Sequence, residues 1–225
     1  MPWRIEFLNC GLLVRKHEDM PGTLVYVMGP SGSGKDSLIA YARANLNAPY
    51  AQTWKTVACV RQVLRPVVFA RRHITRPAAA GSERHYPLTQ DEFQSCKRKG
   101  SFALSWESHG LCYGIGNEID ECLAAGAVVV VNGSREYLPE AMLKYPSLVP
   151  VLIAARPEVL RARLEKRGRE KSADIRERLA GATMKLPDIP GLISLDNSGS
   201  LEGAGRIFSN MFQRLRRMPA PEARQ

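Results

Sequence analysis

Short apolar runs alternate with helical patterns along most of the 225 residues of this chain. Such runs predict strands of a parallel sheet that is buried on both faces, and we expect them at 24–28, 67–74, 128–131, 149–154 and 192–195. The helical patterns predict helices at 35–46, 90–99, 118–125, 157–167, 174–184 and 201–217. The alternation favours an α/β fold with a parallel sheet flanked by helices.

Local signals mark the ends of two of these helices. Thr89 and Glu92 have the spacing of a capping box ahead of the helix at 90–99, and Gly100 stands where a left-handed residue would end it. Pro157 fits the first position of the helix predicted at 157–167.

Three segments lie outside this regular alternation. The stretch 102–115 alternates and is rich in aromatic residues around His109-Gly110, which predicts a small antiparallel hairpin outside the main sheet. The segment 47–65 has a weaker pattern, and we expect an extra helix in it. Residues 1–19 have no periodicity, and we interpret them as a dispensable extension or as the product of an upstream start codon.

Composition indicates a folded protein with an anionic partner. Hydrophobic residues make up 44% and charged residues 24%, which argues against disorder. The net charge of +10 leaves nucleic acid, an acidic membrane surface or a phosphorylated small molecule as partners. The five cysteines are scattered without C-x-x-C spacing, which is typical of reduced thiols in a cytoplasmic protein. No apolar run is long enough to span a bilayer.

A glycine-rich loop, Gly-Pro-Ser-Gly-Ser-Gly-Lys-Asp-Ser, follows the first predicted strand and precedes a helix. It fits the P-loop motif G-x-x-x-x-G-K in the strand, loop and helix context that the motif requires. Backbone N–H groups and the helix N-terminus bind phosphate in such a loop, and the lysine reaches the β and γ phosphates. We therefore expect ATP to be bound by Gly29, Pro30, Ser31, Gly32, Ser33, Gly34, Lys35, Asp36 and Ser37.

The residue after the P-loop lysine departs from the motif. A Ser or Thr at this position usually holds Mg²⁺, and this chain has Asp36 followed by Ser37. A carboxylate is a good ligand for a hard cation, so we predict a Mg²⁺ site at these two residues. In the alternative interpretation, Asp36 is an ordinary helix-start acid that interacts with the helix dipole.

Basic residues gather in a first segment between Ser37 and Ser82, which has seven Lys or Arg and no acidic residue. Within it, Arg72 and Arg76 lie at the end of the second predicted strand, at the edge where open α/β sheets bind ligands. Guanidinium groups bind phosphate oxygens bidentately, so we predict that both arginines bind an acceptor that itself carries phosphate.

A second basic segment runs from 156 to 178, with nine basic and five acidic residues. A glycine interrupts its helical pattern at 168, as expected of a lid that closes over a transferring phosphoryl group. We predict that Arg167 and Arg178 contact that group. We interpret other basic residues here as a solvated helix face, namely Arg161, Lys166 and Lys171.

Together these motifs resemble the guanylate-kinase-like nucleoside monophosphate kinases over about 22–217. The matching segments are 29–37, 74–77, 102–114, Arg163-Leu164 with Arg167-Gly168, and Ile175 with Arg178. The resemblance implies a single P-loop kinase domain over 20–225, with an acceptor-binding insert at about 73–117 and an arginine-bearing lid at about 164–178.

The resemblance also implies further site residues. Asn197 matches the loop on the adenine side of the family's ATP site, and an ordinary turn is the alternative for this segment. Tyr113 matches an aromatic residue of the acceptor site, and a core tyrosine is the alternative. Glu107 and His109 lie in the predicted hairpin, where contact with ribose hydroxyls and stabilisation of the turn both stay open.

Three family features are absent. Guanylate kinases recognise guanine with an acidic and a hydroxyl residue, and the resemblance places Leu104 and Ile115 at these positions. Ala79 stands where a second acceptor arginine is expected. Apolar replacements would leave polar groups of guanine unpaired. With these departures, the segments 34–37, 70–77, 103–111 and 130–135 resemble one subgroup of the family. This resemblance implies ATP-dependent phosphorylation of ribose 1,5-bisphosphate to 5-phospho-α-D-ribose 1-diphosphate in bacterial phosphonate catabolism.

Other functions stay open at this stage. A guanylate or other nucleoside monophosphate kinase would have to recognise its base without the usual pair of residues. A nucleic-acid-binding P-loop ATPase would use the basic excess, but the sequence has no interleaved aromatic and basic surface. An inactive binding module should have lost Lys35 and the lid arginines, which are present. We expect ATP and a small phosphorylated sugar as partners and no membrane, and the sequence leaves the oligomeric state open.

Overall fold

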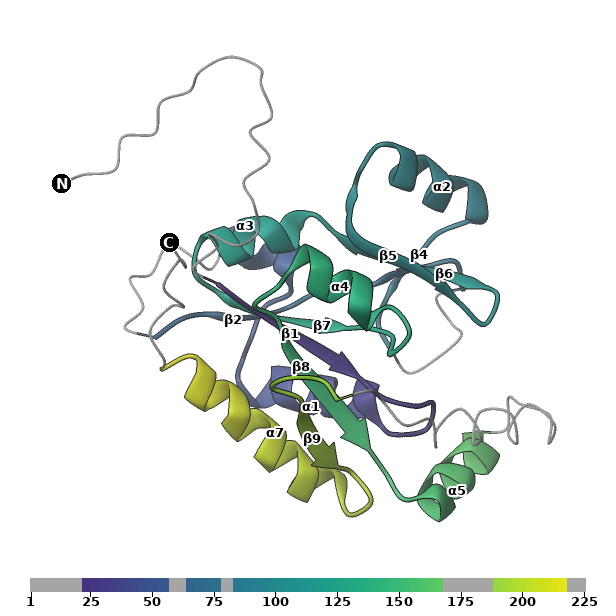
Figure 1. Ribbon diagram of the computed structural model, residues 1–225, viewed down its shortest axis with the longest axis vertical. Coiled ribbons are helices and arrows are strands. Elements are labelled where there is room, and N and C mark those ends of the chain that lie inside the picture. The colour runs from purple at the N-terminus through teal and green to yellow at the C-terminus, as the bar shows by residue number, and fades with distance from the viewer. Residues whose placement is uncertain (1–21, 57–63, 78–82, 168–187, 218–225) are drawn as a thin grey trace.

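A computed structural model describes residues 22–56, 64–77, 83–167 and 188–217. Within these residues the centre of the fold is a five-stranded sheet in the order β2-β7-β1-β8-β9 (Figure 1). Its strands are β1 (Thr23–Met28), β2 (Val67–Phe69), β7 (Val128–Asn132), β8 (Val149–Ala154) and β9 (Ile193–Asp196). Every pairing in this sheet is parallel, which confirms the predicted α/β class.

Helices cover both faces of this sheet (Figure 1). On one face α1 (Lys35–Asn45) and α7 (Leu201–Leu215) close a core that includes Val25 and Val27 of β1. On the other face α3 (Glu118–Ala124) and α4 (Leu138–Lys144) close a second core that includes Tyr26. β1 is buried at every position, as expected for the central strand of a parallel sheet.

A smaller sheet stands beside the first, in the order β4-β3-β6-β5. It consists of β3 (His73–Ile74), β4 (Tyr86–Pro87), β5 (Phe102–Ser108) and β6 (Leu111–Gly116), with α2 (Gln90–Arg98) packed nearby (Figure 1). β5 and β6 form the predicted antiparallel hairpin. His109 and Gly110 at its tip have φ of 50° and 71°, the positive values that a two-residue hairpin turn requires.

The prediction of one strand at 67–74 is wrong. The chain forms β2 in the main sheet and β3 in the smaller sheet, separated by Ala70, Arg71 and Arg72. The two basic residues break the apolar run at the point where the chain crosses from one sheet to the other. This crossing places Arg72 between the two sheets.

Other local expectations are confirmed or extended. Thr89 Oγ1 accepts a hydrogen bond from the Glu92 N–H at 3.2 Å, and Glu92 Oε2 accepts one from the Thr89 N–H at 2.7 Å, so the capping box forms. Gly100 has a φ of 66°, and α5 (Pro157–Arg167) begins at the predicted proline. Within the described part of 47–65, the extra helix is the short 3-10 helix η2 (Ala51–Thr56).

Some expectations are missed or lie outside the described residues. The sequence pattern does not predict α4, because this short helix buries only Leu138 and Ala141 and has a proline in its first turn. The helix expected at 174–184, the extension at 1–19 and Ala79 lie outside the described residues, as does most of the predicted lid. In the described part of the chain, no helix is long and apolar enough to cross a membrane.

Candidate active site

The P-loop lies between the end of β1 and the start of α1, where its glycines adopt backbone conformations that other residues avoid. Gly32 and Gly34 have φ of 83° and 82°, in the left-handed region. A Cβ on Gly34 would collide with the side-chain amide of Asn197. The glycines therefore let the loop turn tightly while it packs against the segment that follows β9.

Asn197 lies beneath this loop. Its Nδ2 donates a hydrogen bond to the Ser33 carbonyl at 2.7 Å, and its side chain is buried. Ser33 is also fully buried and is the one predicted P-loop residue that does not line the open cleft described below. The sequence prediction puts Asn197 at the nucleotide, and the structure places it where it fixes the backbone of the loop.

Arg163 reaches the same loop from α5. Its Nη1 lies 3.5 Å from the carbonyl oxygens of both Gly32 and Ser33. Arg163 had no predicted role of its own, although the apolar Leu160 and Leu164, which are buried, indicate that this face of the helix is turned toward the protein.

Two other basic residues of α5 differ from Arg163 in their exposure. Arg161 and Lys166 are exposed, as that interpretation requires. The side chain of Arg167 and the whole of Arg178 lie outside the described residues, so their predicted lid role stays a prediction.

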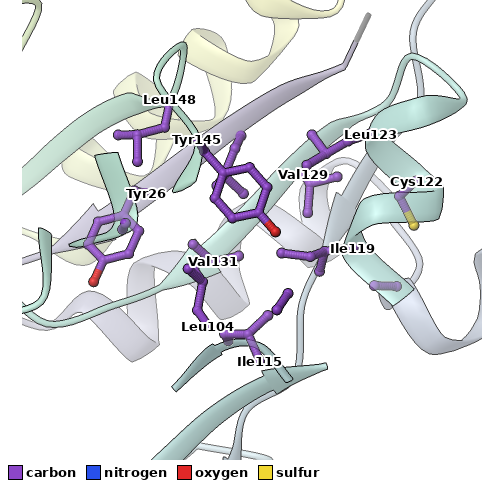
Figure 2. Close-up of a cluster of buried hydrophobic side chains, with 14 of the residues drawn as sticks. Tyr26, Leu104, Ile115, Ile119, Cys122, Leu123, Val129, Val131, Tyr145 and Leu148 are labelled. Atoms are coloured by element: carbon purple, nitrogen blue, oxygen red, sulfur yellow. The ribbon is translucent and has the colours of Figure 1, made fainter. Parts of the chain in front are cut away.

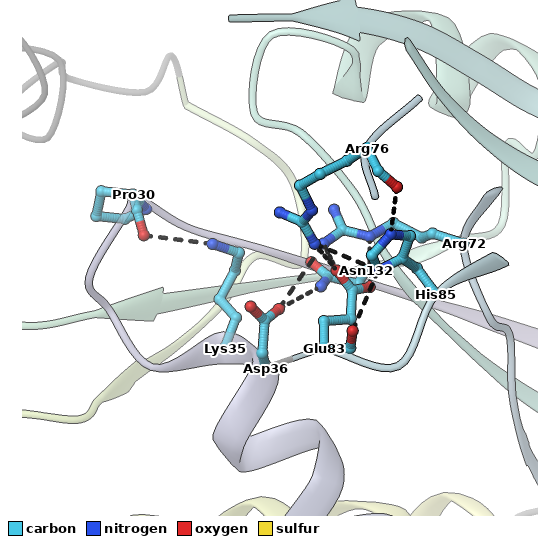
Figure 3. Close-up of polar contacts among 8 residues, drawn as sticks. All are labelled: Pro30, Lys35, Asp36, Arg72, Arg76, Glu83, His85 and Asn132. Carbon is cyan, nitrogen blue, oxygen red and sulfur yellow. Dashed lines mark hydrogen bonds and ion pairs between the residues drawn. The ribbon is translucent and has the colours of Figure 1, made fainter. Parts of the chain in front are cut away.

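Lys35 begins α1 and faces the cleft. Its Nζ donates a hydrogen bond to the Pro30 carbonyl at 3.3 Å (Figure 3). Burial lowers the pKa of Lys35 to about 8, because Asp36 offsets only part of the cost of burying the ammonium charge and Arg72 adds to it. The ammonium group is thus held in a site that lacks enough negative charge, as expected of a lysine that awaits phosphate oxygens.

Asp36 connects the P-loop to two neighbouring elements. Asn132, the last residue of β7, donates a hydrogen bond from Nδ2 to Asp36 Oδ1 at 2.7 Å (Figure 3). Arg72 Nη2 lies 3.8 Å from the same oxygen. Ser37 is exposed and also lines the cleft. Asn132 had no predicted role, because its contact with Asp36 spans 96 residues of sequence.

Arg72 and Arg76 lie together on the insert side (Figure 3). Glu83 accepts a hydrogen bond from Arg72 Nε at 2.7 Å and a second, short one from Arg72 Nη2. Burial opposes the charge on Arg72, but Glu83 and then Asp36 outweigh it and raise its pKa. Arg76 Nη2 lies 3.7 Å from Glu83 and 3.4 Å from His85 Nδ1. Glu83 therefore restrains both predicted arginines.

An aromatic stack forms another wall of the site. Trp106 lies between Tyr113 and Tyr137, with ring centroids 5.5 Å apart on each side. The guanidinium of Arg72 lies 5.2 Å from the centre of the Tyr113 ring. Tyr113 is half-buried and lines the cleft, and its contact with the acceptor stays a prediction.

These groups enclose one cleft of about 530 Å³. Its walls come from the P-loop, the insert, the segment after β7 and α5. Of the predicted acceptor residues, Arg72, Arg76, His109 and Tyr113 line it, whereas Glu107 is exposed on the other side of its strand and does not. The lining includes five basic residues, Lys35, Arg72, Arg76, Arg135 and Arg163, and two acidic ones, Asp36 and Glu136. The cleft therefore has an excess of basic side chains, which suits phosphorylated ligands.

The two positions matched to guanine recognition lie away from this cleft. Leu104 and Ile115 are paired in register on β5 and β6, and both are buried. They point into the core around Val131 and Ile119 (Figure 2). The structure thus uses these positions to join the insert to the main sheet.

The sheet, the P-loop and the arginine-lined cleft define an α/β kinase of the P-loop class. No family model matches the chain. Two curated relatives named ribose 1,5-bisphosphate phosphokinase PhnN, from Desulfomicrobium baculatum and Burkholderia pseudomallei, are 49% and 48% identical to it. The matches cover 84% and 86% of this chain and 92% and 97% of the relatives. The chain therefore belongs to the ribose 1,5-bisphosphate phosphokinase PhnN family.

A solved structure supports the fold independently of these relatives. Guanylate kinase from Anaplasma phagocytophilum aligns with a TM-score of 0.56 over 89% of each chain, at 17% identity. At this identity the likeness shows the fold alone, and it confirms the predicted guanylate-kinase-like architecture.

Proposed function

We propose that this protein transfers the γ-phosphoryl group of ATP to the 1-phosphate of ribose 1,5-bisphosphate, which gives ADP and 5-phospho-α-D-ribose 1-diphosphate in phosphonate catabolism. The observation that carries the proposal is that a P-loop and an arginine pair line the same cleft. Family membership supports the same substrate, because the relatives are named for it.

The residues divide between the two substrates. The loop amides from Gly29 to Gly34 and the Lys35 ammonium would bind the phosphates of ATP. Arg72 and Arg76 would bind the acceptor phosphate, since guanidinium groups match phosphate oxygens. Arg163 lies at the P-loop and adds a positive charge on the ATP side. Arg167 and Arg178 remain proposed contacts of the transferred group.

The donor atoms beside Lys35 fit Mg²⁺. Asp36 and Ser37 offer a carboxylate and a hydroxyl in the cleft, and both are hard oxygen ligands. Asn132 Oδ1 is buried without a hydrogen-bond partner among the described residues, and its neighbouring Nδ2 is bonded to Asp36. We propose that Asp36 and Ser37 hold Mg²⁺, which when bound supplies positive charge to the ATP phosphates.

The proposed transfer needs alignment more than proton movement. The attacking atom is an oxygen of the acceptor 1-phosphate, which is ionised at neutral pH, so no general base is required. The O–P bond forms as the bond between the γ-phosphorus and the bridging oxygen of ATP breaks. The five cations of the cleft hold two strongly anionic substrates together and stabilise the charge that moves between them.

A phosphorus NMR assay tests the proposal. ATP, Mg²⁺ and ribose 1,5-bisphosphate with the wild-type protein should give the two diphosphate resonances of 5-phospho-α-D-ribose 1-diphosphate in addition to those of ADP, and Lys35→Ala should abolish them. A parallel assay with GMP separates the alternative function, since the candidate base contacts are buried apolar residues. Efficient GMP phosphorylation without a diphosphate product from ribose 1,5-bisphosphate would overturn the proposal.

A further inference from the structure

The carboxylate of Glu83 contacts both arginines that are assigned to the acceptor. We propose that Glu83 is a positioning residue that holds Arg72 and Arg76 as one anion-binding unit for the acceptor phosphate. The inference rests on the proposed function, because it assigns the arginine pair to the acceptor. It adds a residue that does not itself line the cleft.

The contact with Arg72 is bidentate. Nε and Nη2 of Arg72 each donate to a different oxygen of Glu83, which fixes both the position and the plane of the guanidinium. Arg72 itself lines the cleft. Glu83 therefore binds two of the three guanidinium nitrogens of Arg72, and Nη1 is the third, to which Glu83 is not bonded.

The same short segment restrains Arg76. Glu83 Oε2 lies 3.7 Å from Arg76 Nη2, and His85 Nε2 lies 2.9 Å from the Arg76 carbonyl. Arg76 Nε is buried and has no hydrogen-bond partner among the described residues. A buried donor without a hydrogen-bond partner costs free energy. Glu83 leaves Arg76 Nε unbonded, so this group can donate to a phosphate oxygen of the acceptor substrate.

Because Glu83 and the two arginines are largely buried, the charge of the Glu83 carboxylate acts strongly on both guanidinium groups. The side chains of Arg72, Glu83 and Arg76 are 11%, 14% and 21% exposed, so solvent screens their charges only partly. Without Glu83, the nearest carboxylate to Arg72 would be Asp36, whose Oδ1 is 3.8 Å away. Arg72 would then be drawn toward the P-loop and away from Arg76.

A second role for Glu83 predicts the opposite effect. If Glu83 were only a negative charge that competes with the acceptor phosphate, its removal would strengthen acceptor binding. If it positions the arginines, its removal weakens acceptor binding although the site becomes more positive. The sign of the change therefore separates the two roles.

The test compares Glu83→Gln and Glu83→Asp with a matched control, Glu140→Gln, at an exposed glutamate on α4. Acceptor binding is measured by calorimetry with ribose 1,5-bisphosphate alone, and turnover is measured with ATP. We expect Glu83→Gln to weaken acceptor binding and raise the acceptor KM by about tenfold or more, with the ATP KM nearly unchanged. Glu83→Asp, which keeps the charge, should lose less, and the control should lose nothing.

A double variant adds a readout that a general loss of structure would not move. In an Arg72→Ala background, Glu83→Gln should weaken acceptor binding less than it does in the wild-type protein, because only the contact of Glu83 with Arg76 is left to lose. Tighter or unchanged acceptor binding in Glu83→Gln would overturn the inference, and so would an equal loss of ATP and acceptor affinity. Wild-type protein that binds the acceptor without phosphorylating it would overturn the proposed function and leave the positioning role testable by calorimetry.

Discussion

Asn132 donates a hydrogen bond to Asp36 at 2.7 Å and so joins the end of β7 to the P-loop. In P-loop proteins the usual metal-binding pair is a hydroxyl on the loop and a carboxylate on a neighbouring strand. Here the carboxylate is on the loop and a neutral amide ends the strand beside β1. One negative charge is present in both arrangements, which favours Asp36 as a metal ligand over Asp36 as an ordinary helix-start acid.

Asp36→Ala should therefore raise the Mg²⁺ concentration needed for half-maximal activity by about tenfold, because it removes the one carboxylate of the proposed site. Titration of the initial rate with Mg²⁺ at fixed ATP checks this. Asp91→Ala, at an exposed helix-start acid of α2, is the matched control. If Asp36→Ala changes only stability, by about 0.3–1 kcal/mol, the helix-dipole interpretation is correct instead.

The lowered pKa of Lys35 predicts that ATP binding depends on pH. Its pKa in the ligand-free protein is lowered to about 8, so the ammonium is charged below that pH and loses its proton as the pH rises through it. ATP phosphates favour the charged form, so binding raises the pKa of Lys35. Affinity for ATP should fall between pH 7 and pH 9, and binding at pH 8.5 should be accompanied by proton uptake.

Calorimetry in two buffers of different ionisation enthalpy measures that uptake directly. Lys35→Met is the control, since it cannot take up a proton. Equal heats in the two buffers with the wild-type protein at pH 8.5 would show that Lys35 keeps its charge throughout.

Arg76→Ala should weaken use of the acceptor by about tenfold or more and leave ATP binding largely intact, because Arg76 lies on the insert and not on the P-loop. Separate KM values for ribose 1,5-bisphosphate and ATP measure the split. Arg84→Ala removes an exposed arginine from the same insert and serves as a charge-matched control. An equal loss of both affinities would contradict the assignment of Arg76 to the acceptor.

The parts of the site that follow from the sequence are those determined by local spacing. The P-loop and the capping box of Thr89 and Glu92 each depend on residues that are close together in the sequence, and both form as predicted. The separation of one apolar run into β2 and β3 could not be predicted, because only the second sheet explains why the chain leaves the first at Arg71.

The residues and roles that the sequence did not predict depend on contacts between distant segments. Asn132 reaches Asp36 across 96 residues, and Asn197 reaches Ser33 across 164. Glu83 is only 11 residues from Arg72, but the pairing depends on the insert folding back so that β4 lies beside β3. The sequence places Glu83 just after a long stretch without acidic residues, and this position is the one signal that could have found it.

Asn197 gives a prediction about the support of the P-loop. Asn197→Ala would leave the buried Ser33 carbonyl without its 2.7 Å hydrogen bond, so we expect the free energy of unfolding to fall by about 1–2 kcal/mol. The loop would also lose the contact that fixes its backbone, so the KM for ATP should rise more than that for the acceptor. Thermal unfolding and steady-state kinetics measure the two effects. Ser198→Ala, at the next residue, is the matched control, and an equal effect of both variants would mean that the whole turn after β9, and not the Asn197 amide, supports the loop.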